Sequence, residues 1–387
     1  MVVAGEASGD LLAAELVSAL RTQSSIAHPP FSPRFIGAGG PRMAAAGVEL
    51  AFDLTRHAAI GVPTLKNLFT GRRLLHQLLA LAREQKPDAL IGVDYGFFNL
   101  RLGHAVKQSV RKHPGAWNPK LIQFVSPQVW ASRPGRANRL ATDYDLLLSI
   151  FPFEKEWYAK RAPALRVEFV GHPLVDRLAA EGRLPGDSMS DAGARGIRPS
   201  DIVLLPGSRR YELQRHLPVM LGALKLIRNR LPGVRAKMVL PNDTLKQLAD
   251  ELSAGSGVET RVDDLPAALS RADLAISKTG TITLECAGFG VPTVTLYKTT
   301  WLTYQIARRI VTVKSLTMPN LLADEEVFPE FVQGAATPEN LAGAALELLQ
   351  DETRRRAIKS RLEKIISSLG EPGAAKRAAA AVLSLLT

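Results

Sequence analysis

Short apolar segments alternate with amphipathic stretches along the chain, which is the pattern of parallel strands joined by helices. In the first half these segments predict strands at 2–4, 34–36, 89–93, 121–125, 145–149 and 167–170. In the second half they predict strands at 202–205, 236–240, 274–276 and 293–297. Helical spacing of apolar residues predicts helices at 11–21, 97–110, 213–231 and 244–252. The chain is therefore predicted to be an α/β protein.

A polar segment at 177–199, rich in Gly, Asp and Ser, separates the two series of strands and has the composition of an exposed linker. With 387 residues the chain is long enough for two domains, each with its own core. We predict domains at 1–176 and 177–365, with glycine-rich strand ends facing a cleft, and a helix at 366–387 that returns to the first domain or swaps to a partner. Because the opening strand is so short, we also expect a few residues upstream of Met1.

Composition narrows the class of protein. Hydrophobic residues make up 46% and charged residues 22%, as in ordinary soluble proteins, and no apolar run reaches the roughly 18 residues of a spanning helix. The first residues lack a leader pattern, which predicts a cytoplasmic protein. The lone Cys286 excludes an internal disulfide and is expected to be buried, and no cluster of His, Asp or Cys predicts a metal. The net charge of +12 favours phosphorylated substrates, acidic lipid or nucleic acid.

Glycines and acidic residues follow the strands of the first half. The turn GEASGD (5–10) contains Gly5 and Gly9, which permit the tight strand-to-helix connection that α/β proteins use to hold ligands. The turn GAGGPRM (37–43) lacks the spacing of a dinucleotide fingerprint, so no nicotinamide cofactor is expected. Asp94 directly follows the predicted strand 89–93, and at this position it would serve either as a general base or as a helix N-cap. The loop SPQVWASRPGR (126–136) suits a sugar phosphate, or is a rim packed on the next helix.

The strand ends of the second half predict a site for a diphosphate. Gly207 lets the backbone approach a ligand, and Arg209 supplies a planar, permanently charged group for phosphate oxygens. A helix predicted to begin at Thr281 presents backbone N–H groups to a phosphate, and Glu285 lies one turn further on, where a carboxylate accepts from ribose hydroxyls. The alternative is an ordinary strand-to-helix turn with a solvated glutamate.

The stretch 58–84 combines leucines at helical spacing with basic residues. Such a segment is typical of a helix that lies in the interface of an acidic bilayer. We predict membrane contact by Leu65, Leu68, Phe69, Arg72 and Arg73. From Leu74 onward, burial in the core of the domain is an equally good interpretation.

Motifs along essentially the whole chain together resemble those of the lipid-A-disaccharide synthases of Gram-negative bacteria. The motifs are GEASGD, GAGGPRM, VDYGFFNLRL, SPQVWASRPGR, GHPLVD, LLPGSRRYE, SKTGTITLE and MPNLLADEEVFPEFVQ, in this order. The resemblance implies a B-type glycosyltransferase fold of two Rossmann-like domains. It also implies an inverting reaction in which UDP-2,3-diacylglucosamine and 2,3-diacylglucosamine 1-phosphate give the β(1→6) disaccharide and UDP. The chain departs from the pattern at Gly96 and Phe97, where the family often has a proline and an acidic residue, so a second carboxylate there has no support.

The resemblance also implies roles for individual residues. Asp94 is expected to be the base, although the chemistry alone leaves Glu6, Asp10 and His172 open. The residues expected around the donor nucleotide are Gly207, Ser208, Arg209, Thr279, Gly280, Thr281, Glu285, Asn320 and Gln333. Those expected around the acceptor or sugar are Gly5, Glu6, Ser8, Gly9, Ser126, Trp130 and His172. No cofactor is expected, because UDP leaves as a dianion and positive groups stabilise it in place of a metal.

Acylated substrates imply work at a membrane surface, so we expect a peripheral protein on the cytosolic face of the inner membrane. A C-terminal helix swapped to a partner would make a homodimer. Two alternatives stay open: another UDP-sugar enzyme of the same fold, such as a peptidoglycan N-acetylglucosaminyltransferase or an epimerase, and a basic scaffold for acidic lipid or RNA. Nucleic acid is the less favoured partner, because the aromatic residues are not interleaved with the basic ones.

Overall fold

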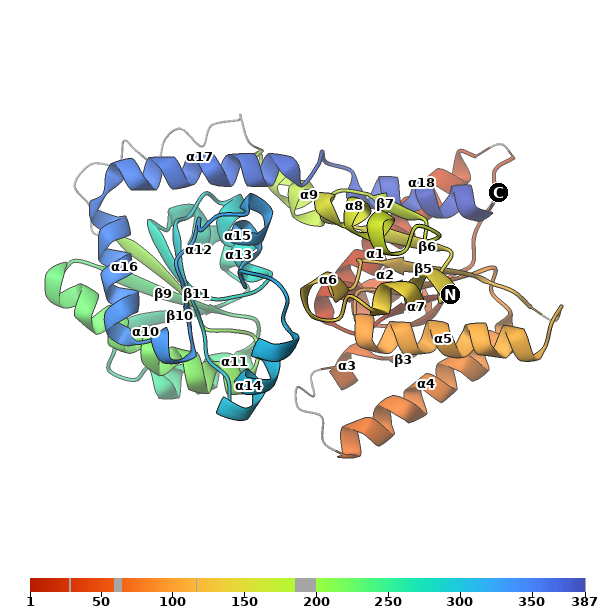
Figure 1. Ribbon diagram of the computed structural model, residues 1–387, viewed down its shortest axis with the longest axis horizontal. Helices are drawn as coiled ribbons and strands as arrows, with labels where there is room; N and C mark the ends of the chain where they lie inside the picture. Colours follow the sequence, from red (N-terminus) through yellow and green to blue (C-terminus); the bar gives the residue numbers. More distant parts are fainter. Residues whose placement is uncertain (28, 59–64, 116, 185–199, 387) are drawn as a thin grey trace. The chain divides into compact units, whose positions relative to one another are not determined.

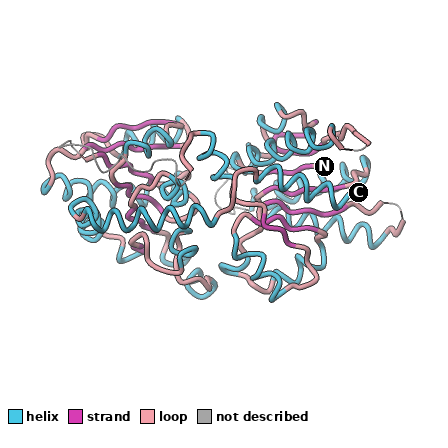
Figure 2. The backbone as a smooth tube through the Cα atoms, turned by 90° about the horizontal axis from the view of Figure 1, so that it is seen from above, coloured by secondary structure: helices cyan, strands magenta, loops and turns pink. Residues whose placement is uncertain are grey.

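The computed structural model describes residues 1–387 except 28, 59–64, 116, 185–199 and 387 (Figure 1). The chain folds into two compact units, of which the first comprises Met1–Asp176 with Leu369–Thr387 and the second Arg177–Ser368. Each unit contains one parallel β-sheet with its own helices, as the tube view also shows (Figure 2). Most of the predicted linker falls outside the described residues.

The first unit is built on a seven-stranded parallel sheet with the order β3-β2-β1-β4-β5-β6-β7. Its strands are β1 (Val2–Ala4), β2 (Ile36–Gly39), β3 (Glu49–Asp53), β4 (Ala89–Val93), β5 (Lys120–Phe124), β6 (Leu146–Ser149) and β7 (Val167–Phe169). The central strands β1, β4 and β6 are buried throughout. Helices on both faces of a parallel sheet leave no polar side, which is why these strands appear in the sequence as continuous apolar runs.

The helices of the first unit are α1 (Ala7–Ser25), α2 (Pro41–Ala45), α3 (Thr55–Ala58), α4 (Leu65–Gln85), α5 (Gly96–Lys112), α6 (Val129–Ser132), α7 (Arg136–Asp143), α8 (Pro152–Arg161) and α18 (Ala374–Leu386). Helix α9 (Pro173–Ala180) begins in the first unit and ends in the second. Helix α4 buries Leu74, Leu78 and Ala82 in the hydrophobic core. The interpretation of the stretch from Leu74 onward as core is therefore confirmed.

The second unit has a six-stranded parallel sheet with the order β10-β9-β8-β11-β12-β13. Its strands are β8 (Asp201–Leu205), β9 (Arg235–Leu240), β10 (Val258–Val262), β11 (Leu274–Lys278), β12 (Thr293–Tyr297) and β13 (Glu330–Val332). Its helices are α10 (Arg210–Arg230), α11 (Asp243–Leu252), α12 (Leu265–Arg271), α13 (Ile282–Gly288), α14 (Trp301–Ile310), α15 (Met318–Ala323), α16 (Pro338–Gln350) and α17 (Glu352–Ser368), with a 3-10 turn at η2 (Gln333–Ala335). The pair α10 and α16 packs closely together.

Three strands were not predicted from the hydrophobic pattern, namely β3, β10 and β13. All three lie at sheet edges, and none of their residues is fully buried. An edge strand has a neighbour on one side only, so it tolerates polar residues such as those of Glu49–Asp53 and Val258–Val262. Their pairing with β2, β9 and β12 depends on the completed sheet.

The C-terminal helix α18 packs on α1 within the first unit. The carboxylate of Asp176 accepts from the backbone N–H of Ala374 at 3.0 Å, and Arg377 Nε donates to the carbonyl of Val170 at 2.8 Å. Of the two predicted positions for this helix, the structure has the one on the chain's own first unit. Among the described residues, no helix combines the length and the hydropathy that crossing a bilayer requires.

Candidate active site

In each sheet the order of the strands reverses at one place, the topological switch point. This point lies between β1 and β4 in the first unit and between β8 and β11 in the second. Ligands of open α/β sheets bind at the carboxyl ends of the strands that flank such a point. The turns that follow these strands are GEASGD and VDYGFF in the first unit, and PGSRR and TGT in the second. Many of the expected site residues, among them Asp94, Gly207 and Gly280, lie in these turns.

The turns after β1 and β4 lie against each other. A Cβ atom placed on Gly5 would lie 2.1 Å from Cδ1 of Tyr95, so only glycine fits there. A Cβ on Gly9 would lie 3.4 Å from the Cβ of Asp94. The hydroxyl of Ser8 donates to Oδ2 of Asp94 across 3.5 Å. The structure thus brings Gly5, Ser8 and Gly9 together with Asp94, 85 or more positions later in the chain.

The backbone at Asp94 is held in an uncommon conformation. Asp94 and Tyr95 both have left-handed φ values, of 49° and 43°. The main-chain carbonyl of Asp94 accepts from Asn99 Nδ2 at 2.9 Å and from Gln123 Nε2 at 3.0 Å. Two consecutive left-handed residues without glycine cost free energy, and such strain concentrates at functional sites. The N-cap of α5 is Tyr95, so Asp94 does not serve as the helix cap.

Asp94 as a whole is only partly exposed. Burial raises the pKa of its carboxyl group above the ordinary value, against the opposing hydrogen bonds from the Tyr95 N–H and from Ser8. A raised pKa makes the carboxylate a stronger base, which suits proton abstraction from a hydroxyl.

The alternative base Asp10 has a different task. Its buried carboxylate accepts from the backbone N–H groups of Gly40 at 2.8 Å, Arg42 at 3.0 Å and Met43 at 3.1 Å. It therefore satisfies the first N–H groups of α2 and holds the turn after β2. Both of its oxygens are therefore engaged with the backbone of this turn.

Glu6 and His172 occupy other positions in the first unit. Glu6 is the N-cap residue of α1, and its charge adds to burial in raising the pKa of Tyr95. His172 accepts from the Leu174 N–H through Nδ1 at 3.0 Å, and its ring lies 5.4 Å from that of Phe151. These contacts hold the turn before α9.

Trp130 and Ser126 are buried, each less than a tenth exposed. Trp130 Nε1 donates to the carboxyl of Glu154 at 2.9 Å, and Ser126 Oγ lies 3.2 Å from the hydroxyl of Tyr158. Glu154 is fully buried on α8, and burial raises its pKa to about 7, against hydrogen bonds from Trp130 and Ser126. Trp130 therefore anchors the loop to α8 instead of presenting its indole N–H to a ligand.

Glu154→Gln is expected to change how stability depends on pH. The pKa of Glu154 rises from 4.5 to about 7, so the folded protein keeps a proton that the unfolded chain releases. The stability from the neutral carboxyl is fully present below about pH 4.5 and is lost as pH rises to about 7, in total roughly 3 kcal/mol. Urea unfolding at pH 5 and pH 8 measures this loss, which the glutamine variant should lack. Glu156→Gln, on the exposed side of the same helix, is the control and should keep the loss.

Four arginines lie together at the end of the loop 126–136 and on the neighbouring helices α5 and α7. Partial burial and the charges of Arg133, Arg139 and Arg101 lower the pKa of Arg136. Arg101 stacks on the exposed ring of Phe97 at 4.2 Å. None of the four guanidinium groups forms an ion pair with a described residue. A cluster of arginines that has no acidic partner among the described residues favours a multiply charged anion as ligand.

In the second unit, Glu212 organises the turn after β8. Gly207 has a left-handed φ of 133°, and the Ser208 N–H donates to Oε2 of Glu212 at 2.8 Å. Glu212 is buried, and its other oxygen binds Lys278 Nζ, from the end of β11, at 3.1 Å. Glu212 and Lys278 thus tie the two turns at the switch point together. Neither residue was predicted from the sequence to belong to the site, although both lie inside the motifs.

Arg209 begins α10 as its N-cap residue. Its side chain is exposed, and NH1 donates to the hydroxyl of Tyr211 at 3.3 Å. Across the switch point, Gly280 has a φ of 114°, which only glycine adopts without strain, and α13 begins at Ile282, next to Thr281. Strand β11 continues to Lys278, two residues further than predicted.

Glu285 forms an ion pair with Arg177, on α9. Burial raises the pKa of Glu285, and the charge of Arg177 opposes this rise. Both side chains remain partly exposed, at 25% for Glu285 and 40% for Arg177. The sequence pattern gave no signal for Arg177, which stands at the start of the predicted linker.

Asn320 and Gln333 are engaged within the chain. The buried amide of Asn320 donates to Phe328 O at 2.8 Å and to Glu330 Oε1 at 2.9 Å, and it accepts from the N–H groups of Val327 and Phe328. Gln333 accepts from the Thr299 N–H at 2.7 Å. With its hydrogen-bonding capacity used, Asn320 shapes the loop before β13.

His216 also lies between turns of the second unit, although the sequence did not predict it as a site residue. Its Nδ1 lies 2.7 Å from the carbonyl of Pro206, so this nitrogen carries the proton and Nε2 accepts from the Lys298 N–H at 3.1 Å. Burial lowers the pKa of His216, which favours this neutral form. The ring therefore connects the turns after β8 and β12.

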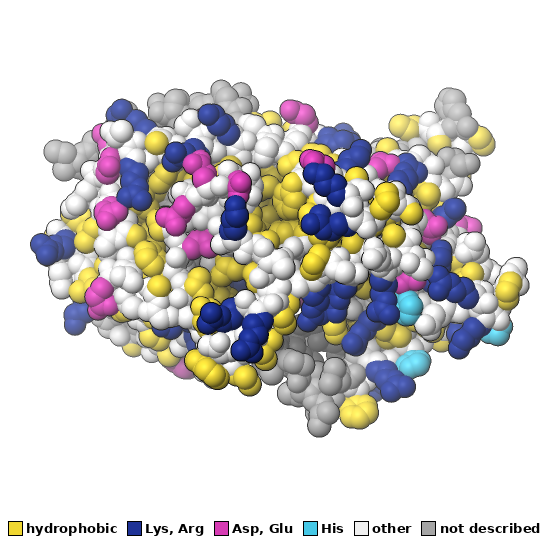
Figure 3. Space-filling view, in the orientation of Figure 1, with side chains coloured by type: hydrophobic (Ala, Val, Ile, Leu, Met, Phe, Trp, Pro, Cys, Tyr) yellow, Lys and Arg dark blue, Asp and Glu magenta, His cyan; other side chains and the backbone are white. Residues whose placement is uncertain are grey.

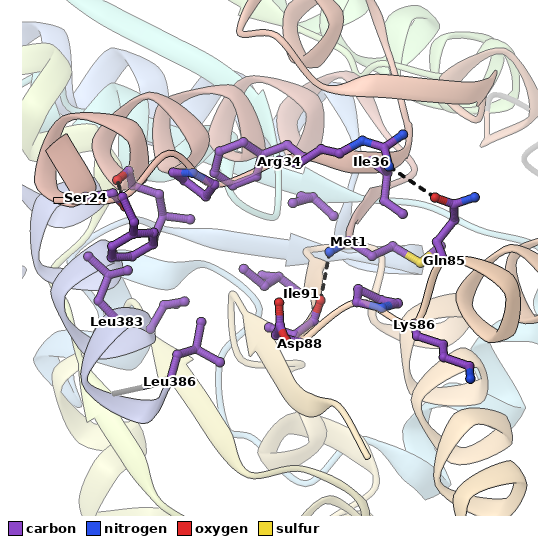
Figure 4. Close-up of a pocket in the computed structure, with 18 residues that line it drawn as sticks. Met1, Ser24, Arg34, Ile36, Gln85, Lys86, Asp88, Ile91, Leu383 and Leu386 are labelled. Atoms are coloured by element: carbon purple, nitrogen blue, oxygen red, sulfur yellow. Dashed lines mark hydrogen bonds between the residues drawn. The ribbon is translucent and has the colours of Figure 1, made fainter. Parts of the chain in front are cut away.

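The first unit also contains a pocket at the amino-terminal ends of its strands, opposite the turns described above (Figure 4). It is lined by the amino-terminal ends of β1, β2 and β4 and by α18, and Arg34 NH1 donates to Gln85 Oε1 at 3.3 Å beside it. This pocket is separate from the turns around Asp94, which lie at the carboxyl ends of the strands. Among the described residues, no group of three or more His, Cys, Asp and Glu side chains is placed to hold a metal ion.

Comparison with solved structures identifies the fold. The UDP-N-acetylglucosamine 2-epimerase of Neisseria meningitidis, solved with UDP-N-acetylglucosamine bound, matches with a TM-score of 0.59 at 12% identity, over 96% of each chain. A glycosyltransferase of Rickettsia africae matches with a TM-score of 0.55 at 12% identity, over all of this chain and 97% of the other. The two α/β units with parallel sheets form a B-type glycosyltransferase fold.

Comparison of sequences is more specific. The family model described as lipid-A-disaccharide synthetase matches residues 1–385. The lipid-A-disaccharide synthase of Geobacter metallireducens is 36% identical over 394 residues, which cover all of this chain and 97% of the relative. The chain therefore belongs to the lipid-A-disaccharide synthetase family and is a glycosyltransferase of lipid A biosynthesis.

Proposed function

We propose that the enzyme joins UDP-2,3-diacylglucosamine to 2,3-diacylglucosamine 1-phosphate through a β(1→6) bond, with Asp94 as the general base. The observation that carries this proposal is the strained strand end at which Asn99 and Gln123 hold the Asp94 backbone. Family membership supports the choice of a UDP-sugar donor and a phosphosugar acceptor. The alternative bases have less support, because Asp10 already has three backbone donors.

In the proposed reaction, Asp94 takes the proton of the acceptor 6-hydroxyl as its oxygen bonds to the anomeric carbon of the donor. The bond from that carbon to the UDP oxygen breaks, and its electron pair leaves with UDP. Attack from the face opposite UDP inverts the anomeric carbon, through a transition state with oxocarbenium character. Asp94 ends protonated, and its raised pKa favours this state.

The leaving diphosphate needs positive potential. We assign this role to Arg209 and to the backbone N–H groups of the turn at Thr279, Gly280 and Thr281. Glu212 supports them by holding Ser208 and Lys278. Glu285 is proposed to accept from the ribose hydroxyls. Asn320 and Gln333 act by shaping the surrounding loops.

The acceptor carries a phosphate, which suits the four arginines of the first unit that form no ion pair with a described residue. The four arginines lie on or beside the loop 126–136, which contacts the start of α5, where a Cβ on Gly96 would approach Pro127 to 3.0 Å: they are Arg133 and Arg136 of the loop, Arg139 of α7 and Arg101 of α5. Arginine binds phosphate oxygens in a bidentate manner. We assign the acceptor phosphate to this cluster and the sugar to the turns of Gly5, Ser8 and Gly9.

The membrane surface completes the proposal. Phe69 is 72% exposed at the start of α4, and Arg72 and Arg73 are exposed beside it. An exposed aromatic ring among basic residues suits an anionic lipid surface, so the protein is proposed to be peripheral on the cytosolic face of the inner membrane. The side chains of Leu65 and Leu68 lie outside the described part of the chain. A homodimer formed by exchange of α18 is retained as a proposal, because exchange would preserve the contacts of Asp176 and Arg377.

A transfer assay tests the function. Purified protein is incubated with radiolabelled UDP-2,3-diacylglucosamine or UDP-N-acetylglucosamine, and with the acylated acceptor with or without its 1-phosphate. We expect disaccharide only from the acylated donor, with the phosphorylated acceptor preferred. The double variant Arg133→Ala with Arg136→Ala should raise KM for that acceptor by about tenfold or more and leave KM for the donor unchanged. Turnover of only the unacylated donor would instead support the related enzymes of this fold.

A further inference from the structure

Helix α14 of the second unit has no buried residue over its ten positions. Trp301 is 72% exposed, Leu302 63% and Ile306 50%. Three large apolar side chains on one short helix are unusual for a free surface, because isolated exposed residues are common but contiguous apolar patches mark interaction sites. The proposed reaction does not use this helix.

The three apolar side chains share one side of α14. Leu302 and Ile306, four positions apart, lie on the same face of the helix, and Trp301 lies about 100° from Leu302, so the three form an apolar stripe about 140° wide. The helix has a defined start, because Thr300 Oγ1 accepts from the Thr303 N–H at 3.2 Å. Figure 3 shows hydrophobic side chains gathered over α14, with basic side chains next to them.

The charge of the segment selects the kind of partner. Residues 301–314 contain Arg308, Arg309 and Lys314 and no acidic residue. Both arginines are exposed in the last turn of the helix. Lys314 is 89% exposed, and its ion pair with Asp324, at 3.6 Å, is equally open to solvent. An apolar stripe with a tryptophan and adjacent arginines matches an anionic bilayer interface, where the ring and the aliphatic side chains enter the acyl boundary and the arginines meet phosphates.

We propose that α14 is a second lipid-binding surface, through which the second unit binds an anionic membrane. The inference rests on the proposed function to the extent that acylated substrates require work at a bilayer. It goes beyond that function because it assigns the second unit a membrane contact of its own, independent of Phe69 and the start of α4. The occupant is the bilayer itself, and not an acyl chain of the substrate.

Vesicle binding tests the inference without any substrate. The full chain is sedimented with vesicles of phosphatidylglycerol and phosphatidylethanolamine, and with vesicles of phosphatidylcholine alone. We expect the double variant Leu302→Ser with Ile306→Ser to lower affinity for the anionic vesicles by about tenfold or more. Leu252→Ser, a 40% exposed leucine on α11 of the same unit, is the matched control and should bind like the wild type. Equal binding by the double variant and the control would overturn the inference.

Tryptophan fluorescence provides an independent reading. Anionic vesicles should shift the emission of the wild type to shorter wavelength, and Trp301→Phe should remove most of this shift because Trp301 is the most exposed tryptophan among the described residues. A shift that persists in Trp301→Phe would count against α14. Concentration-dependent self-association that the double variant abolishes would show an interface between copies and would also overturn the inference.

Activity separates this inference from the proposed function. With substrates dispersed in detergent, the double variant should keep wild-type turnover, whereas on vesicles its rate should fall with its binding. Lost turnover in detergent would mean that the helix serves the reaction itself, which contradicts a purely lipid-binding role. A wild type that binds vesicles through α14 but forms no disaccharide would support the inference and refute the proposed function.

Discussion

Asp94→Asn is expected to lower kcat for disaccharide formation by about a thousandfold, with UDP affinity unchanged. Asparagine keeps the size of the side chain and the backbone contacts to Asn99 and Gln123, but it cannot accept the proton of the acceptor hydroxyl. Positioned general bases contribute about 10²- to 10⁴-fold to rate. Single-turnover transfer and calorimetric UDP titration measure the two quantities separately.

The pH profile gives a second test of Asp94. Burial raises its pKa, and a base acts only when deprotonated, so kcat/KM of the wild type should rise with pH on a limb that lies above the ordinary carboxyl value of 3.8. Glu6→Gln is the matched control, because Glu6 is a nearby carboxylate in the turn after β1, and it should keep this limb. If Asp94→Asn keeps more than about a tenth of wild-type kcat, another group is the base.

Arg209→Ala is expected to lower kcat/KM for the donor by about a hundredfold or more. Arg209 is exposed at the start of α10, in the turn after β8, where we place the diphosphate. The interaction of the guanidinium with the diphosphate becomes stronger as negative charge grows on the leaving group. Its loss should therefore lower kcat as well as the affinity for the donor. Steady-state kinetics with varied donor, and calorimetric titration with UDP, separate the two effects.

Arg210→Ala provides the control for Arg209. Arg210 has the same charge and is also exposed, but it is the first residue of α10 and not its N-cap. Removal of a general positive field would affect both variants alike, whereas a specific diphosphate contact affects Arg209→Ala alone. Equal losses in the two variants would refute the assignment of Arg209.

Much of the fold could be predicted from local pattern. The buried strands β1, β4 and β8 appear as apolar runs because a parallel sheet covered on both faces leaves little room for polar side chains. The edge strands β3, β10 and β13 could not be predicted in this way, because one open side permits polar residues. Their existence depends on a neighbouring strand that is already in place.

The residues of the candidate site also fall into those that local pattern predicts and those that it does not. Asp94, Gly207, Arg209 and Gly280 could be selected from sequence because each follows a predicted strand, and the carboxyl ends of parallel strands hold ligands. The residues that hold them could not be selected. Glu212 looks like any acid in the first turn of a helix until its contacts with Ser208 and Lys278 are known.

Trp130 shows that a motif residue can be engaged within the protein itself. Its place in an aromatic and basic loop suggested contact with a sugar, but in the structure it is buried and donates to Glu154, 24 positions later. The side-chain amide of Asn320 likewise forms its hydrogen bonds within the chain, to Phe328 and Glu330 before and at the start of β13. A sequence motif indicates that a residue type matters, while its contacts decide whether it binds a ligand or positions the residues that do.

By itself the sequence determined the α/β class, the two series of strands, the turns that carry the chemistry and the family. These follow from side-chain periodicity, from glycine at strand ends and from motif order, all of which act over a few residues. The tertiary structure alone decided the pairs Asp94 with Ser8, Glu212 with Lys278 and Glu285 with Arg177, and the exposed stripe on α14. Such contacts join residues far apart in the chain, and burial and electrostatic pairing between them arise only once the sheets and helices have packed.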